Sequence, residues 1–164
     1  MSHQAQEKNG KLNRRYLTFV LGKELYGVDI HRVKTIISIL PVTPVPGAPE
    51  YFVGVINLRG IILPVIDLRR RFAMPLLEYG QDATIIVQEI DFSGKIEQMG
   101  FLVDQVSEVI DINQEDIESG TDVGGTGLNS FFDGIAHPGG KVITLLNVQA
   151  VFLPDSEASI VLQV

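Results

Sequence analysis

The chain contains no cysteine and no tryptophan among its 164 residues. The lack of cysteine excludes disulfides, thiol nucleophiles and thiolate metal ligands, and it fits a reducing compartment. No apolar run approaches the ~20 residues that a membrane span needs. The opening MSHQAQEKNGKLNRR is polar and lacks the hydrophobic stretch of a secretion signal. We therefore expect a disordered lead-in over residues 1–14, followed by a soluble cytoplasmic protein.

A basic surface is missing as well. Lysine and arginine total 13 against 20 aspartates and glutamates, so the formal net charge is -7. Nonspecific nucleic-acid binding needs clustered positive charge to displace counterions, and the overall field here has the opposite sign. The sequence thus argues against nucleic acid as a partner, against an anionic membrane surface and against direct membrane insertion.

Short apolar segments separated by turn residues make up most of the chain. Apolar residues account for 45 % of it, with 16 glycines and 8 prolines, a composition typical of all-β proteins with short strands. RYLTFVL and ELYGVDI predict a hairpin around Gly22-Lys23, and FVGVINL and GIILPVIDL predict another around Arg59-Gly60. Pro64 cannot donate to a ladder, so its strand is predicted to be an edge strand or to carry a bulge. No helical pattern separates the strands, which argues against a parallel sheet.

The second half of the chain repeats the plan of the first. Residues 52–72 align without a gap to residues 132–152, and the turn glycines Gly54 and Gly60 meet Gly134 and Gly140. An earlier pair of segments matches at a constant offset of 73, which places Gly27, Ile30, Val33, Ile36 and Ile37 on Gly100, Val103, Val106, Val109 and Ile110. Closing each half into a barrel would remove exposed sheet edges. We expect two small, intertwined five-stranded barrels, at about 15–80 and 81–153, and a tail at 154–164.

No motif in the chain carries recognisable catalytic, metal or phosphate chemistry. The three histidines lack metal-ligand spacing and are interpreted as surface or turn residues. The acidic stretch from Asp111 fails as a calcium loop because Asp116 and Asp122 stand where glycine and glutamate are needed, so Asn113 is interpreted as the cap of a short helix. GTDVGGTG, residues 120–127, lacks the ending of a phosphate loop and reads as a flexible linker. We expect no metal and no cofactor.

An enzyme built from two β halves can be considered and set aside. An aspartic-protease dyad needs one aspartate per half, but Asp67 aligns with Asn147. A GxSxG turn for serine chemistry is absent. The default is a binding module, and the run Arg69-Arg70-Arg71 is interpreted as a solvated turn, with pairing to acceptors as the alternative.

Four motifs resemble the CheW family of bacterial chemotaxis coupling proteins. They are YLTFVLGKELYGVDIHRVKTI, YFVGVINLRGIILPVIDLRRRF, MGFLVDQVSEVI and FFDGIAHPGGKVITLLNV. The likeness extends from Arg15 to Phe152, and the order of glycine, asparagine, arginine and proline in GVINLRGIILPVIDLR is its most specific part.

The resemblance implies two SH3-like barrels and an adaptor without enzymatic activity. Members of the family join the cytoplasmic tips of chemoreceptors to the regulatory domain of the histidine kinase CheA, and they build rings, which gives other CheW copies as possible neighbours in cytoplasmic arrays. The residues implied on the receptor side, in the groove between the barrels, are Ile30, Val33, Thr84 and Val106. The residues implied at or near the kinase side are Val42, Thr43, Val45, Gly54 and Arg59.

The chain departs from the family pattern at Thr35. Many members carry a glutamate there, placed to pair with the arginine of the NLRG motif, which is Arg59 in this sequence. Arg59 is therefore expected to find another carboxylate or to face solvent or a partner. Two other readings stay open, a CheV-type regulator and an unrelated ligand-binding or enzymatic double barrel. The first lacks a receiver segment before the chain ends at Val164, and nothing in the residues favours the second.

Overall fold

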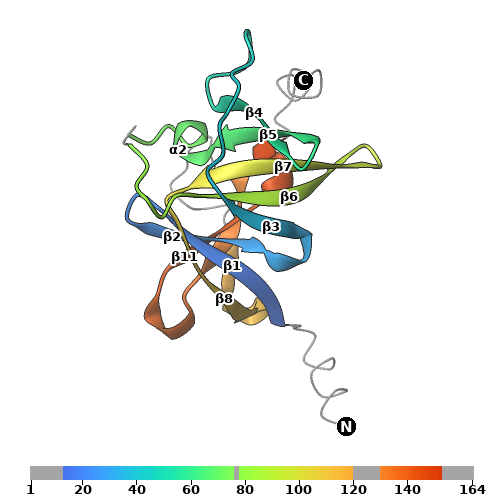
Figure 1. Ribbon diagram of the computed structural model, residues 1–164. Helices are drawn as coiled ribbons and strands as arrows, with labels where there is room; N and C mark the ends of the chain where they lie inside the picture. Colours follow the sequence, from blue (N-terminus) through green and yellow to red (C-terminus); the bar gives the residue numbers. More distant parts are fainter. Residues whose placement is uncertain (1–12, 76–77, 120–129, 153–164) are drawn as a thin grey trace.

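The computed structural model describes residues 13–75, 78–119 and 130–152, which form an assembly of short strands (Figure 1). The strands are β1 (Asn13–Leu21), β2 (Glu24–Asp29), β3 (Val33–Ser38), β4 (Phe52–Leu58), β5 (Ile61–Asp67), β6 (Thr84–Phe92), β7 (Lys95–Val103), β8 (Gln105–Asn113), β9 (Ile117–Ser119), β10 (Phe132–Ala136) and β11 (Ile143–Leu146). The helical turns are η1 (Ile30–Arg32), α2 (Leu68–Arg71), η2 (Gln114–Asp116), η5 (Pro138–Gly140) and α3 (Val148–Phe152). Most of the expected lead-in, the expected linker and the tail at 154–164 lie outside the described residues.

The strands form two sheets, which confirms the all-β prediction. One sheet has the order β3-β6-β7-β5-β4, and the other has the order β8-β1-β2-β11-β10-β9. The first five strands of the second sheet repeat the arrangement of the first sheet. The sixth strand was not predicted; it arises because the segment after η2 pairs with β10, for example Glu118 with Ile135. Asn113 accepts a hydrogen bond from the Glu115 N–H at 3.0 Å, so the predicted cap of that short helical turn is confirmed.

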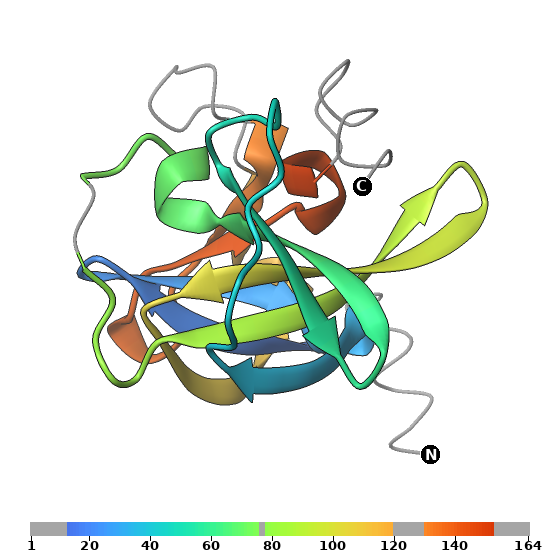
Figure 2. The same ribbon diagram turned by 45° about the horizontal axis from the view of Figure 1, so that its top comes forward.

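Each sheet combines strands from both halves of the sequence. The β1–β2 hairpin lies beside β8 and β11, and the β6–β7 hairpin lies between β3 and β5 (Figure 1 and Figure 2). The junctions are the two parallel ladders, in which Val65 faces Gly100 and Leu145 faces Gly27. A boundary near residue 80 therefore does not separate the two sheets, because each half lends its first hairpin to the other half's strands.

The matched glycines of the repeat are explained by close backbone approach. A Cβ atom on Gly54 would lie 2.2 Å from the Thr43 carbonyl oxygen, and one on Gly134 would lie 2.3 Å from the Glu118 carbonyl oxygen. Both distances are below any allowed contact, so neither site accepts a side chain without moving the backbone. The repeat thus preserves the same crossing of β4 and β10 by the segment that precedes each of them.

Pro64 is accommodated by the register of its strand. β5 is an interior strand, but its ladder with β7 covers only residues 65–67, so Pro64 interrupts no bond on that side. The register shift in the β4–β5 ladder lies between Phe52 and Gly54 instead.

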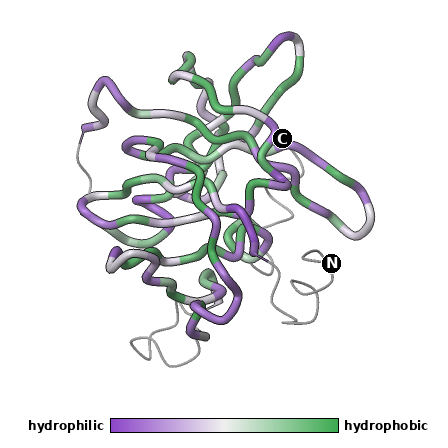
Figure 3. The backbone as a smooth tube through the Cα atoms, turned by 90° about the horizontal axis from the view of Figure 1, so that it is seen from below, coloured by the Kyte–Doolittle hydropathy of each residue, from purple (hydrophilic) through white to green (hydrophobic). Residues whose placement is uncertain are grey.

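A shared core holds the two sheets together. The largest group of buried apolar residues draws on both sheets and on α2 and α3, including Phe19, Phe101 and Phe152. Two smaller groups, one around Ile143 and one around Leu63, fill the individual barrels. Figure 3 shows hydrophobic segments through the middle of the molecule and hydrophilic ones at several outer turns. The barrels consequently meet across a packed apolar junction.

Candidate interaction surfaces

Three of the four residues implied on the receptor side lie at the junction of the barrels. Ile30 is in η1, Val33 begins β3, and Val106 is near the start of β8. All three are half-buried and pack against the shared core. Val33 pairs with Gln88 on β6, and Val106 pairs with Phe19 on β1, which are matching positions of the repeat. The two valines therefore occupy equivalent places in the two sheets.

Thr84 lies apart from Val33 along the same ladder. Thr84 is the first residue of β6 and pairs with Ser38, at the opposite end of β3. On its other side it pairs with Val103, three positions before Val106 in the sequence. Its hydroxyl donates to the Asp82 carbonyl at 2.8 Å, so its local role is to close the turn into β6.

The loop implied on the kinase side is fastened to β4. Thr43 and Val55 exchange two backbone hydrogen bonds of 2.9 Å each, with Gly54 beneath them. The flanking valines differ in their contacts: Val45 packs against the shared core and Val42 against the core of the first barrel. The buried Gly54 thus shapes the loop through its missing side chain.

Arg59 lies at the far end of β4, in the turn to β5. Its backbone is left-handed, with φ of 53°, and the next residue, Gly60, donates its N–H to the Asn57 side chain at 2.8 Å. The matching residue of the second barrel is Gly139, which has φ of 62°. The Arg59 side chain is exposed and forms no ion pair within the described ranges, as expected from the presence of threonine at position 35.

Both barrels expose apolar side chains at equivalent positions. Ile36 on β3 is 42 % exposed, and its counterpart on β8, Val109, is 48 % exposed. Just after the β4–β5 turn Ile62 is 57 % exposed, and Val142, its counterpart, is 55 % exposed. Exposed aliphatic side chains that recur on both repeats are typical of surfaces that meet partners.

Arg69 is buried and Arg71 is half-buried, so the interpretation of the arginine run as a solvated turn was wrong for these two residues. The Arg69 guanidinium pairs with the Asp104 carboxylate, and their side chains are 7 % and 15 % exposed. Asp104 also accepts the Gly22 N–H at 2.6 Å. This network joins α2 to the corner between β7 and β8 and to the β1–β2 turn. The sequence of the run gives no indication that Arg69 pairs with a residue 35 positions later in the chain.

Arg71 lies between two aromatic rings at matching positions of the repeat. Its guanidinium carbon is 4.3 Å from the ring centres of both Tyr51 and Phe131, and its Nε donates to the Val151 carbonyl at 3.1 Å. Such stacking favours a cation over the ring faces. Arg70, by contrast, is exposed, with its Nε 3.6 Å from Asp67.

Asp67 and Tyr79 form a second, partly buried contact. Asp67 caps α2 by accepting the Arg69 N–H at 2.9 Å, and it also accepts the Tyr79 hydroxyl. Burial, followed by the hydrogen bond to this carboxylate, raises the pKa of Tyr79 well above its ordinary value. Tyr79 therefore stays neutral and donates, which ties the segment before β6 to α2.

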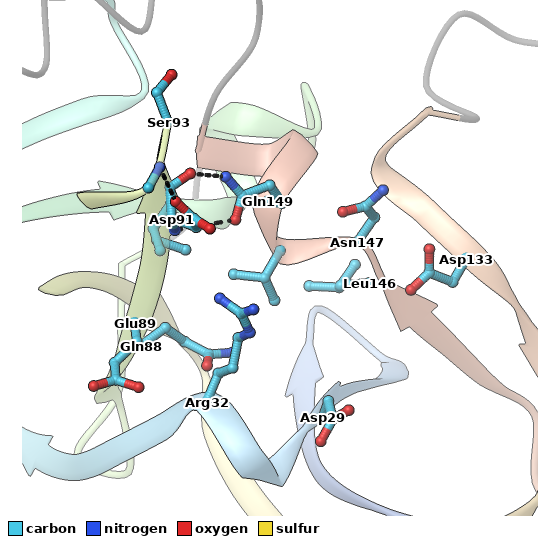
Figure 4. Close-up of a pocket in the computed structure, with 13 residues that line it drawn as sticks. Asp29, Arg32, Gln88, Glu89, Asp91, Ser93, Asp133, Leu146, Asn147 and Gln149 are labelled. Carbon is cyan, nitrogen blue, oxygen red and sulfur yellow. Dashed lines mark hydrogen bonds between the residues drawn. The ribbon is translucent and has the colours of Figure 1, made fainter. Parts of the chain in front are cut away.

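A cavity of about 540 Å³ opens between the two sheets. Its walls come from the end of β2, η1, β6 with its turn, β10 and the β11–α3 corner (Figure 4). The lining residues are Asp29, Arg32, Gln88, Glu89, Ile90, Asp91, Ser93, Gly94, Asp133, Leu146, Asn147, Val148 and Gln149. None of the residues implied for receptor or kinase lines it.

The parts of the chain that the structure describes contain no group of three His, Cys, Asp or Glu side chains that could hold a metal ion. Within the same ranges, no helix has the length and apolar character needed to cross a bilayer.

Comparison with known proteins gives a consistent family. The model of the CheW-like domain matches residues 15–153. A chemotaxis protein CheW of Rhizobium meliloti is 35 % identical over 88 % of this chain and 90 % of its own length. One of Treponema pallidum is 34 % identical over 83 % of this chain and 80 % of its own. The crystal structure of the scaffolding protein TtCheW from Thermoanaerobacter tengcongensis superposes with a TM-score of 0.79 at 35 % identity, covering 88 % of this chain and 95 % of that one.

Proposed function

The chain belongs to the CheW-like domain family, and we propose on this premise that it couples chemoreceptors to the histidine kinase CheA in a cytoplasmic array. The family comprises chemotaxis scaffold proteins rather than enzymes. The proposal adds the two partners, the regulatory domain of CheA and the receptor tips, with neighbouring CheW copies as further contacts.

One observation supports an adaptor more than any other: the two barrels expose equivalent apolar residues while sharing one core. Ile36 and Ile62 on one barrel correspond to Val109 and Val142 on the other. A rigid body with two similar exposed ends can hold two protein neighbours at a fixed distance. Apolar side chains that are more than 40 % exposed gain most when a partner removes them from water.

The kinase side is proposed at the first barrel because Arg59 marks it. A non-glycine residue with positive φ is uncommon, and the second barrel uses glycine at the same place. Retaining arginine there costs backbone strain and gives an exposed guanidinium without a partner among the described residues. Arginines in such settings often dominate the energy of an interface.

The receptor side is proposed at Val33 and Val106. Their equivalent positions on either side of the barrel junction suit a helical hairpin, which can present apolar residues to both. Thr84 is proposed to lie at the end of this surface.

Calorimetric titration with the CheA regulatory domain tests the proposal. We expect saturable binding, weakened about tenfold or more by Arg59→Ala, because an arginine hot spot contributes ~2 kcal/mol or more. Unfolding should stay within ~0.5 kcal/mol of wild type, since Arg59 is exposed. Arg15→Ala, at another exposed arginine, is the matched control and should leave the affinity unchanged. Intact binding combined with a large loss of stability would overturn the assignment.

A receptor tip fragment tests the other surface. Val33→Ala and Val106→Ala should each weaken receptor binding without affecting binding of the kinase domain. If both variants lose kinase binding equally, the two surfaces are not separate and the division of residues is incorrect.

A further inference from the structure

The cavity between the sheets has strongly acidic walls. Asp29, Glu89, Asp91 and Asp133 face the single guanidinium of Arg32, a formal excess of three negative charges. Figure 4 shows Asp133 on one side, Glu89 and Asp91 on the other, and Arg32 rising between them. The carboxylates converge on one space from separate elements of both sheets.

Two of these carboxylates have no basic partner. Glu89 lies 3.6 Å from Lys34, and Asp29 lies 2.8 Å from His31 and 4.0 Å from Arg14. Asp91 and Asp133 have no lysine, arginine or histidine nitrogen within 4.0 Å in the part of the chain that the structure describes. Burial raises the pKa of Asp133, against the opposing effect of Arg14, so its negative charge is poorly compensated.

Gln88 supplies an independent sign of a missing ligand. Its residue is only 1 % exposed, it lines the cavity, and its buried side-chain oxygen accepts no hydrogen bond. A buried acceptor without a donor costs free energy, and such groups are uncommon in native proteins. The terminal torsion of glutamine is soft, so this amide can turn its oxygen toward a donor that enters the cavity.

The repeat shows that the amide is not required by the fold. Gln88 and Phe19 occupy equivalent strand positions in the repeat. Gln88 pairs with Met99, and Phe19 pairs with Tyr26, the residue that matches Met99. Phe19 is fully buried and part of the shared core. The same strand position is thus filled by an apolar ring in one half and by an unsatisfied amide beside an open space in the other.

We propose that this cavity binds an organic cation with several N–H donors, an alkylguanidinium or alkylammonium group. Such a group donates to the Gln88 oxygen and offsets one unit of the excess negative charge on the cavity walls. Charge-assisted hydrogen bonds of this kind are about twice as strong as neutral ones. The volume is within the range of small-ligand sites. The group is carried either by a free amine or by a basic side chain of another protein.

NMR titration of the 15N-labelled full chain tests the site, with two probes to distinguish the sources. Agmatine represents a free cation and acetyl-arginine-amide a side chain in a protein. We expect saturable shifts at cavity residues, with dissociation constants near ~1 mM, as befits small ligands. Equal binding of both probes assigns the site to the guanidinium itself, and binding of the amide alone assigns it to a protein side chain. No shift up to ~50 mM of either probe overturns the proposal.

Three variants separate binding from folding. Gln88→Leu conserves volume and should weaken binding about tenfold while unfolding at the same or a higher temperature, because the unsatisfied acceptor is gone. Asp133→Asn should also weaken binding about tenfold. Asp116→Asn removes an exposed carboxylate outside the cavity and should bind as wild type. Unchanged affinity in the first two variants, or shifts at the same residues with inorganic phosphate, would contradict a cation site.

Discussion

The buried pair of Arg69 and Asp104 yields the sharpest stability prediction. Changing Asp104 to alanine leaves a guanidinium that is 7 % exposed without its carboxylate, and it also removes the acceptor of the Gly22 N–H. Breaking a buried ion pair from one side typically costs ~3–5 kcal/mol, because the remaining charge stays in a medium of low polarity. A domain of this kind has only ~5–15 kcal/mol of stability in total, so much of it would be lost.

Urea unfolding followed by circular dichroism measures the effect. With a slope near ~2 kcal/mol/M, a loss of ~4 kcal/mol lowers the midpoint by ~2 M. Asp111→Ala is the matched control: Asp111 pairs with Arg15 at 3.1 Å, but the two side chains are 56 % and 70 % exposed. That exposed pair contributes only ~0.2–1 kcal/mol.

The comparison of the two aspartates can refute the reasoning. Equal shifts for Asp104→Ala and Asp111→Ala would show that burial does not govern the cost. A second check removes both charges: Arg69→Met with Asp104→Leu should recover part of the stability lost in Asp104→Ala, since no unpaired charge remains. A double variant no more stable than Asp104→Ala would point to the other contacts of Arg69, including its stacking on Tyr79.

Three further predictions follow from the described contacts. Gly54→Ala should destabilise the fold far more than Gly47→Ala, because both have positive φ but only Gly54 faces a carbonyl oxygen at 2.2 Å; thermal unfolding compares them, and equal losses would exclude the close approach as the cause. Asp133→Asn should raise the unfolding midpoint at pH 7. Because burial raises the pKa of the Asp133 carboxyl, the folded protein holds this proton more tightly than the unfolded chain does. As pH rises the carboxyl ionises and the folded state loses that stabilisation, whereas asparagine stays neutral. The advantage of the variant should therefore vanish below pH ~4, and an advantage that persists in acid would contradict this. Thr35→Glu should alter kinase affinity by giving Arg59 a partner, as the matching Glu108 has in Lys141 at 3.5 Å; unchanged calorimetric titration would show that Arg59 does not bind the kinase.

The strands were predictable because local pattern decides them. Alternating apolar residues and turn glycines located the β1–β2 and β4–β5 hairpins. The predicted match of Gly27 with Gly100 is also confirmed, since each lies on a strand that pairs with a parallel neighbour. The all-β assignment depended on such local signals and on nothing distant.

The intertwined arrangement was expected, but which hairpins join the strands of the other half was not predictable from the same signals. An apolar alternation indicates which face of a strand is buried but not which sheet receives it. The solvated-turn prediction was wrong for Arg69 and Arg71 for a related reason, because only the folded chain brings Asp104, Tyr51 and Phe131 next to α2. The cavity left one trace in the sequence, a glutamine inside the apolar strand TIIVQEI where the other half has phenylalanine.

The exchanged hairpins have a consequence for synthesis of the chain. The β1–β2 hairpin leaves the ribosome first, yet its neighbours on either side are β8 and β11. At ~5–20 residues per second, several seconds pass before those strands exist. Throughout that interval both edges of the hairpin present unpaired N–H and C=O groups, and neither half of the nascent chain can complete a barrel alone. The sheet that contains this hairpin is therefore completed only after β11 has been made, whereas all strands of the β3-β6-β7-β5-β4 sheet exist once β7 has been made.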